Sequence, residues 1–283
     1  MYKKLHHFIA GQIDEGGNRR TGLVFNPATG EVDAEVPYAS ADVVDKAVAA
    51  AKTALEDWSR TSVTERSQIL FRFRELITEN IDVLAKIVSH EHGKTIADSK
   101  GSIQRGVDVV EFACGIPHLM KGEYSANVGG GIDTYSVREP VGVVAGVTPF
   151  NFPVMIPLWI GVIAVACGNS FINKPSEKNP SAPLYLAELW QRAGLPDGVW
   201  NVINGDKESV DSLLDHNGIA AISFVGSTKV GEYIYKQGSA TGKRVQAFCG
   251  AKNHMVILPD ADMDQAADAL MGAGYGSSGQ RCM

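Results

Sequence analysis

The chain has 283 residues, of which 45% are hydrophobic and 20% are charged, and its formal net charge is −6. This length and apolar content suffice for one large or two ordinary domains, each with its own core. The charges form no long basic run, which argues against nucleic acid or anionic lipid as a partner and favours small-molecule chemistry.

The cysteines stand far apart in the sequence, as Cys114, Cys167, Cys249 and Cys282. They form no CxxC pair, and the polar first residues contain no apolar secretory segment. The pattern predicts reduced thiols in a cytoplasmic compartment.

The first part of the chain predicts short strands followed by helices. Residues 6–40 combine apolar stretches with turn sequences such as NPATG, which is typical of short strands. Residues 40–60 have helical apolar spacing, and residues 62–94 form a long helical stretch. Ser62 and Glu65 at its start fit a capping box.

The middle of the chain contains no charged residue between Glu139 and Lys174. The sequence TPFNFP divides this stretch, and the apolar run at 154–167 is shorter than the roughly 20 residues that a membrane span needs. We therefore interpret the stretch as a strand at 141–147, an apolar helix and a second strand at 170–174, and expect no membrane association.

The same alternation continues to the end of the chain. Strands are expected at 199–205, 219–226, 243–250 and 254–258, and helices at 207–216, 227–239 and 263–276. This order predicts an α/β protein with a doubly wound, Rossmann-like parallel sheet.

Polar residues follow two of the expected strands, where open α/β sheets bind their ligands. Asn151 could donate its amide to an oxyanion, although on spacing alone an Asx turn that starts the next helix is the simpler interpretation. Lys174 and Glu177 could bind the two hydroxyls of an adenosine ribose, and the acid would favour NAD over NADP. The alternative for this pair is solvated loop charges.

Two further patterns carry weaker signals. In FVGSTKVG, Ser227 stands at the start of a helix, where it could bind a pyrophosphate or act as a simple N-cap. His90, Glu91 and His92 are too close together for an HExxH site, and no Cys/His set has zinc spacing. We expect no metal.

Several motifs together resemble those of the aldehyde dehydrogenase superfamily. They are VTPFNFP, NKPSE, GLPDGVWNVING, FVGSTKVG, GAKNH and GQRC, which occur in that family's order and approximate spacing. The sequences PFNFPVMIP, RVQAFCGAKNH and GQRCM are most similar to the CoA-acylating methylmalonate-semialdehyde dehydrogenase branch.

The resemblance assigns roles to individual residues. It implies that Cys282 is the nucleophile, although from residue type alone a buried structural thiol is the simpler interpretation. It implies that Asn151 and the Cys282 amide form an oxyanion hole. It places Lys174, Glu177 and Ser227 in contact with NAD and adds the residues that line the coenzyme path: Thr148, Phe150, Lys178 and Cys249.

One position departs from the hydrolytic members of the superfamily. Those enzymes usually carry a glutamate that activates the deacylating water, and here the corresponding residue is Phe248. A phenyl ring cannot act as a base, whereas a thiol with an ordinary pKa near ~8.5 needs less activation than water. The resemblance therefore implies coenzyme A as the acyl acceptor, with loss of CO2 to give acetyl-CoA or propanoyl-CoA.

The substrate implied by the resemblance is malonate or methylmalonate semialdehyde, which carries a carboxylate. A guanidinium binds a carboxylate in bidentate geometry. Arg105, on an expected helix, and Arg281, beside the nucleophile, are the candidates for this contact. Surface salt bridges are the alternative.

Superfamily members are longer than this chain, so the resemblance implies an N-terminal fragment. Residues 1–252 would be the NAD-binding domain, with part of an oligomerisation arm near 123–140, and residues 253–283 the start of a catalytic domain. The uncut protein would be a homo-oligomer, either a dimer or a homotetramer, and the fragment would expose apolar surface.

Two alternatives remain open at this stage. One is a hydrolytic aldehyde dehydrogenase that uses another base. The other is a non-catalytic NAD-binding fragment or interaction module.

Overall fold

A seven-stranded sheet forms the centre of the computed structural model, which describes residues 3–17 and 20–282. Its strand order is β12-β11-β8-β9-β10-β2-β3, and neighbours from β12 to β10 run parallel. The strands are β8 (Val143–Val147), β9 (Ser170–Lys174), β10 (Trp200–Val202), β11 (Ala221–Val225), β12 (Arg244–Phe248), β2 (His7–Ile9) and β3 (Gln12–Asp14). The predicted parallel sheet is confirmed, and an antiparallel pair, β2 and β3, extends it at one edge.

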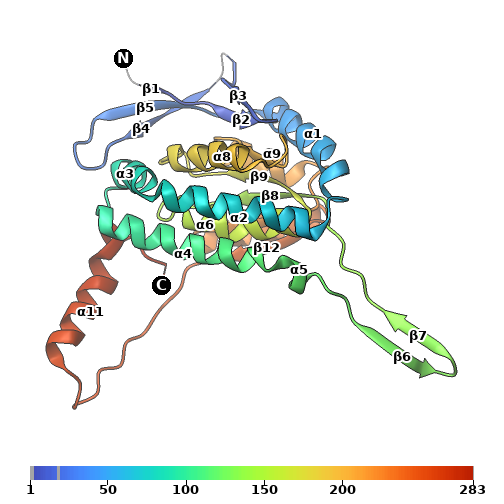
Figure 1. The fold of residues 1–283 in the computed structure, drawn as a ribbon. Helices are drawn as coiled ribbons and strands as arrows, with labels where there is room; N and C mark the ends of the chain where they lie inside the picture. Colours follow the sequence, from blue (N-terminus) through green and yellow to red (C-terminus); the bar gives the residue numbers. More distant parts are fainter. Residues whose placement is uncertain (1–2, 18–19, 283) are drawn as a thin grey trace.

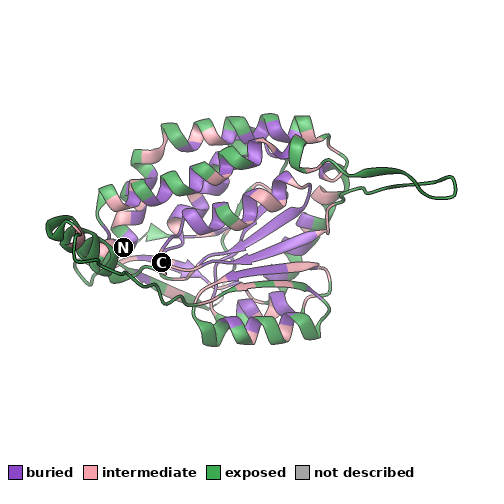
Figure 2. Ribbon diagram, turned by 90° about the horizontal axis from the view of Figure 1, so that it is seen from below, coloured by how far each residue is buried: buried purple, intermediate pink, exposed green. Residues whose placement is uncertain are grey.

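Helices cover both faces of this sheet (Figure 2), so every residue of β8 and β9 is buried. Side chains alternate between the two faces, as a strand requires. Val143 and Ala145 join one apolar cluster, and Val144 joins the other. The first cluster includes α1 (Ala41–Trp58), α9 (Lys207–Asp215) and α10 (Thr228–Ala240), and the second includes α2 (Val63–Glu79), α3 (Ile81–His92), α4 (Ile96–Cys114) and α8 (Ser181–Ala193).

The long helical stretch at 62–94 is divided into two helices. The Ser62 side chain accepts a hydrogen bond from the Glu65 amide, and the Glu65 carboxylate accepts one from the Ser62 amide, which confirms the capping box. The break falls at Asn80, whose side-chain amide donates to the Leu76 carbonyl at 2.7 Å. This side-chain bond to the preceding turn is a common alternative to continued helix.

The uncharged stretch folds as the expected strand, helix and strand. Its helix is built from α6 (Met155–Pro157), a π-helical turn η1 (Leu158–Val162) and α7 (Ile163–Ala166). A Cβ on Gly106 of α4 would lie 2.7 Å from Leu158 Cδ1, so this glycine lets the two elements approach closely. Within the described part of the chain, no helix combines the length and apolarity needed to cross a membrane.

Short strands also form near the start of the chain and at a projecting hairpin. A three-stranded sheet contains β1 (Lys3–Lys4), β5 (Val32–Pro37) and β4 (Thr21–Phe25). After α5 (Ile116–Leu119), strands β6 (Tyr124–Gly129) and β7 (Ile132–Tyr135) form a hairpin that extends away from the body (Figure 1), and all their residues are exposed.

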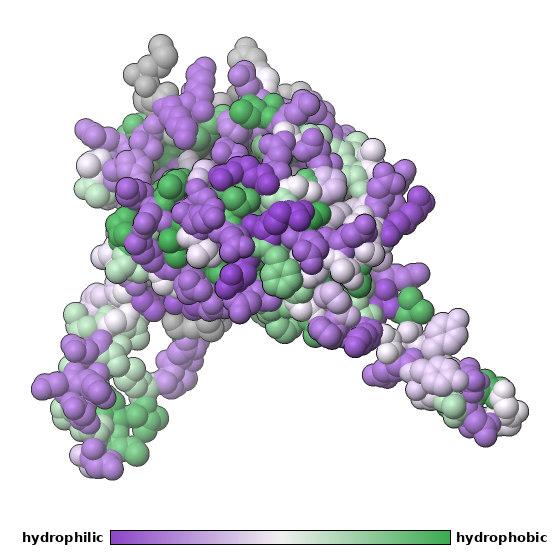
Figure 3. All heavy atoms as spheres, viewed as in Figure 1, coloured by the Kyte–Doolittle hydropathy of each residue, from purple (hydrophilic) through white to green (hydrophobic). Residues whose placement is uncertain are grey.

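The segment after β12 differs from the sequence-based expectation. The predicted strand at 254–258 is wrong: these residues are exposed and extended, and no strand of the described chain pairs with them. Helix α11 (Met263–Tyr275) forms as expected, yet none of its residues, all described, is buried. Figure 3 shows hydrophobic residues on this projecting arm, and the exposed ones include Met255, Val256, Leu258, Met271 and Tyr275.

Candidate active site

The strand order places a ligand crevice at one point of the sheet. The chain runs outward from β8 through β9 to β10, and then returns to β11 on the other side of β8. In open α/β sheets the crevice for ligands lies beyond the carboxyl ends of the strands at such a switch point. The loops after β8 and β11 therefore flank the candidate site.

The loop after β8 is fixed by neighbours from the next strand and loop. Thr148 is 3% exposed, and its hydroxyl donates to Asn173 Oδ1 at 3.2 Å. The carbonyl of Phe150 accepts a hydrogen bond from Asn179 Nδ2, and the Lys178 ammonium lies 4.9 Å from the Phe150 ring centre. Thr148 is thus held by a residue of β9, whereas Phe150 and Lys178 contact each other.

Lys174, the last residue of β9, is buried and donates to the Gly205 carbonyl at 2.8 Å. Its ammonium lies 3.8 Å from the carboxylate of Glu177, whose side chain is 36% exposed. Burial lowers the pKa of Lys174, and the Glu177 carboxylate opposes that shift. The partly exposed carboxylate near the end of the strand can accept hydrogen bonds from ligand hydroxyls.

Ser227 and Cys249 lie at the ends of β11 and β12. Ser227 is exposed at the N-terminus of α10, and its side chain caps no amide of the described helix. The free amides of that first turn can therefore bind an anion. A Cβ on Gly231 would lie 2.3 Å from Cys249 Sγ, so the thiol packs directly against α10.

Asn151 is bonded on both its backbone and its side chain. Its side-chain amide donates to the Gln280 carbonyl at 2.9 Å, and its own carbonyl accepts from Lys94 Nζ at 2.6 Å. Lys94 is only 2% exposed and lies 4.2 Å from the centre of the Phe152 ring. The amide of Asn151 is therefore directed at the loop that precedes Cys282.

Burial lowers the pKa of Lys94 to about 8, and the charges of Arg105 and Arg281 act in the same direction. No sequence motif predicted a role for this lysine. The only local signal is Gly93, whose φ of 85° ends α3 and turns the chain at Lys94.

Cys282 packs at the edge of a small apolar cluster. The buried members are Phe152, Met155 and Ile156, and Val225 at the end of β11 also contacts them. The thiol is free and partly buried. Burial raises the pKa of another free thiol, Cys114, to about 11, which makes it a poor nucleophile.

Of the two arginines proposed for the substrate, Arg105 on α4 lies near this cluster, whereas Arg281 in the thiol loop is paired with Asp98. The Arg105 guanidinium lies 5.9 Å from the Phe152 ring centre. The Arg281 guanidinium lies 3.2 Å from Asp98 Oδ1, so it already has a carboxylate partner within the chain. No sequence motif predicted a role for Asp98.

Phe248 ends β12 and is 54% exposed, at the same edge of the sheet as the predicted coenzyme residues. An aromatic side chain here offers neither an acid nor a base to a ligand.

A hollow of about 390 Å³ opens between the loop after β8 and the loop before Cys282. Phe150, Lys178, Ser278 and Gln280 line it, together with His92. The His92 ring is 8% exposed, and neither of its nitrogens has a hydrogen-bond partner in the described part of the chain. Burial lowers the pKa of His92 to about 4, so the ring is neutral near pH 7.

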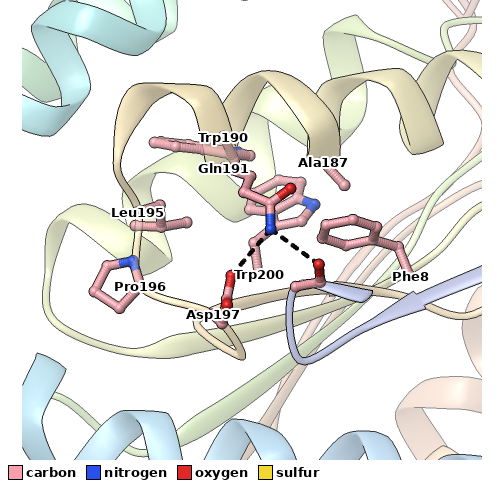
Figure 4. Close-up of a pocket in the computed structure, with 9 residues that line it drawn as sticks. Phe8, Ala187, Trp190, Gln191, Leu195, Pro196, Asp197 and Trp200 are labelled. Carbon is pink, nitrogen blue, oxygen red and sulfur yellow. Dashed lines mark hydrogen bonds between the residues drawn. The ribbon is translucent and has the colours of Figure 1, made fainter. Parts of the chain in front are cut away.

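A second cavity lies at the opposite edge of the sheet, before β10 (Figure 4). Its volume is about 10 Å³, and Gln191 crosses it to donate to the Gly11 carbonyl and to Asp197. A space of this size holds about one water molecule at most. It is not a substrate site.

Over residues 3–17 and 20–282, no three His, Cys, Asp or Glu side chains come close enough together to hold a metal ion. Met283, the last residue of the GQRCM motif, lies outside the described residues.

Comparison with known proteins gives consistent results. The sequence model of the aldehyde dehydrogenase family matches residues 14–283. A malonate-semialdehyde dehydrogenase from Pseudomonas aeruginosa is 54% identical over 99% of this chain. An acylating mitochondrial methylmalonate-semialdehyde dehydrogenase from Arabidopsis thaliana is 49% identical over the whole chain.

A crystal structure of a Sinorhizobium meliloti protein complexed with NAD superposes with a TM-score of 0.97 at 54% identity and covers all of this chain. The present chain spans 57% of that structure, 56% of the Pseudomonas protein and 47% of the Arabidopsis protein.

Proposed function

Because this chain belongs to the aldehyde dehydrogenase family, we propose that it carries the coenzyme site and the nucleophile of an NAD-dependent, CoA-acylating semialdehyde dehydrogenase. The substrates are malonate or methylmalonate semialdehyde. The main support for the proposal is the hydrogen bond between Asn151 and Gln280. It brings a side-chain amide donor next to the loop that ends at Cys282, whose thiol is free and partly buried.

The first step is attack of the Cys282 thiolate on the aldehyde carbon. A C–S bond forms, and the carbonyl electron pair moves to oxygen, where the Asn151 amide and the Cys282 backbone amide stabilise the charge. In this step Asn151 exchanges its bond to Gln280 for a bond to the oxyanion. The apolar side chains of Phe152 and Met155 limit access of water to the thiol.

The second step converts the adduct at Cys282 into a thioester. NAD, when bound, would accept the hydride that leaves the former aldehyde carbon. Glu177 and Lys174 would hold its adenosine ribose, and the free amides at the start of α10 would hold its pyrophosphate. The exposed Glu177 carboxylate repels a 2′-phosphate, which favours NAD over NADP.

The third step is transfer of the acyl group to coenzyme A. Its thiolate attacks the thioester carbon, and the Cys282 thiolate leaves. Phe248 supports this acceptor because the position offers no base for activating water. The β-carboxylate of the acyl group leaves as CO2, and the remaining carbanion takes a proton, so the product is acetyl-CoA or propanoyl-CoA.

Arg105 is the better placed of the two arginines for binding the substrate carboxylate. Its guanidinium lies over Phe152 in the cluster that contains Cys282 and forms no ion pair within the described chain. Arg281 contributes positive charge to the same region, although Asp98 holds its guanidinium.

The experiment that tests the proposal is NADH formation by the full gene product with malonate semialdehyde, with and without coenzyme A. Turnover only in the presence of coenzyme A is the expected result. Equal turnover without it would assign water as the acceptor and would favour the hydrolytic alternative.

A further inference from the structure

The loop of residues 277–281, which ends beside Cys282, is tied to helix α4 at both of its ends. Asp98 Oδ2 accepts a hydrogen bond from the Ser277 amide at 3.1 Å, and Asp98 Oδ1 accepts one from the Arg281 guanidinium at 3.2 Å. We propose that Asp98 is a positioning residue that holds the nucleophile loop in its reactive conformation. The inference rests on the proposed function in that Cys282 is taken as the nucleophile.

The loop needs such a tether because its backbone conformation is unfavourable. Ser277 and Ser278 have φ values of 55° and 54°, and Gly279 follows at 71°. Left-handed conformations of non-glycine residues cost about 1–3 kcal/mol each and persist only where the surroundings impose them. Consecutive left-handed serines will therefore relax unless contacts outside the loop hold them.

Asp98 is itself held in place. It lies in the first turn of α4, and its amide donates to the Oγ1 of Thr95, the N-cap residue. Helix α4 packs closely against the apolar helix of the core through Gly106. The carboxylate therefore fixes the loop relative to helix α4. One of its oxygens binds Ser277 at the start of the loop, and the other binds Arg281 at its end.

A second contact acts on the same loop from the other side, because the Asn151 side chain donates to the Gln280 carbonyl. In the proposed mechanism Asn151 exchanges this bond for one to the oxyanion, whereas Asp98 contacts no reacting atom. Asp98 can therefore hold the loop throughout the reaction, including the step in which Asn151 changes partner.

The pairing with Asp98 also changes the expected role of Arg281. A guanidinium that already binds a carboxylate offers fewer donors to a second one. Substrate carboxylate recognition then depends mainly on Arg105, and removal of Asp98 frees Arg281 to bind the substrate nonproductively.

An acidic residue in the first turn of a helix also stabilises the helix through its dipole, without any effect on a distant loop. The chain offers a matched control for this simpler role. Asp82 occupies the first turn of α3 and pairs with Lys100, with no contact to the thiol loop.

The test compares Asp98→Asn, Asp98→Ala and the control Asp82→Asn in the full gene product. Two readouts are measured on each folded protein: kcat and KM for the semialdehyde, and the rate at which iodoacetamide alkylates Cys282, followed by peptide mass spectrometry. The alkylation rate does not depend on turnover, so it decides the role of Asp98 even if the proposed function fails.

The tether predicts opposite changes in the two readouts for Asp98→Ala. Its kcat falls on the order of 10- to 100-fold because the thiol is misplaced, and Cys282 alkylates faster, by about threefold or more, because the loop opens. Asp98→Asn keeps one hydrogen-bond acceptor, so its kcat and its alkylation rate should lie between those of Asp98→Ala and the wild type. If both Asp98 variants match Asp82→Asn in kcat and in alkylation rate, the proposal is overturned.

Discussion

Every residue of β8 and of β9 is buried, whereas none of the residues of α11, each of them described by the structure, is buried. The proposed coenzyme residues lie at or after the ends of strands that belong to this buried sheet. Cys282, the proposed nucleophile, follows α11, and its loop is attached to the body by Asp98 and Asn151.

The difference shows two ways of placing a reactive side chain. Packing on both faces of a sheet fixes the strands, and side-chain hydrogen bonds such as that from Thr148 to Asn173 add to this at the strand ends. A loop outside the sheet needs particular hydrogen bonds, so single polar substitutions should move the nucleophile more than they move the coenzyme site.

The largest expected difference in stability lies between an apolar truncation in the sheet region and one in the arm. Phe73 is fully buried and stacks on Trp190, with ring centres 3.5 Å apart. Phe73→Ala should lower the free energy of unfolding by about 3–5 kcal/mol, measured by urea denaturation. Leu270→Ala, at a 47% exposed position of α11, should change it by no more than about 0.5 kcal/mol. Equal losses would contradict the comparison.

The next effect concerns catalysis at the junction of the two regions. Asn151→Ala should lower kcat by about 100- to 1000-fold, because it removes the proposed oxyanion donor. The control is Asn217→Ala, an exposed asparagine between α9 and β11. Steady-state kinetics with saturating NAD measure both variants. If the kcat of Asn151→Ala is close to that of the control, Asn151 does not stabilise the oxyanion.

Acid sensitivity should arise in the sheet region. Burial lowers the pKa of His7 to about 4, and His7 Nδ1 accepts the Asn204 amide at 3.0 Å. The unfolded chain, with an ordinary histidine pKa near ~6.5, binds more protons at this residue between these values, so the contribution of His7 to the free energy of unfolding falls as the pH drops from about 6.5 to 4. His92 adds a change of the same sign.

Urea midpoints measured across this pH range test the assignment. His7→Gln keeps an acceptor but cannot titrate, so its midpoint should fall less steeply than that of the wild type. An unchanged pH dependence in this variant would place the acid-sensitive group elsewhere.

The smallest effect compares two helix caps. Ser62→Ala removes the cap of α2, a helix packed in the core, and should lower the free energy of unfolding by about 1 kcal/mol. Asp262 caps α11 through the amides of Asp264 and Gln265. Asp262→Ala should reduce helical content in α11 without changing the urea midpoint of the sheet. A shift of that midpoint would mean that the arm and the sheet unfold together.

Much of the fold was predictable from the sequence because its local patterns agree with its packing. The β-branched run of β8, the apolar helix after it and the capping box at Ser62 each determine one element almost alone. The same logic failed at residues 254–258, since an apolar run does not specify whether a neighbouring strand exists to accept its backbone hydrogen bonds.

The candidate site was predictable only in part. Asn151, Lys174 and Ser227 follow strands, so the parallel sheet itself brings them to one edge. Lys94 is hydrogen-bonded to Asn151, which is 57 residues away in the sequence, and Asp98 is hydrogen-bonded to Ser277, which is 179 residues away. Contacts that join such distant segments depend on how whole helices pack, which no local spacing encodes.

Amide hydrogen exchange tests the central claim most directly. On this chain, the amides of β8 and β9 should exchange only through global unfolding, those of 254–275 should exchange within the first time points, and Ser277 should be protected until Asp98 is replaced. Protection of 254–275 comparable to that of the sheet, or a Ser277 amide that exchanges equally fast with and without Asp98, would contradict the account.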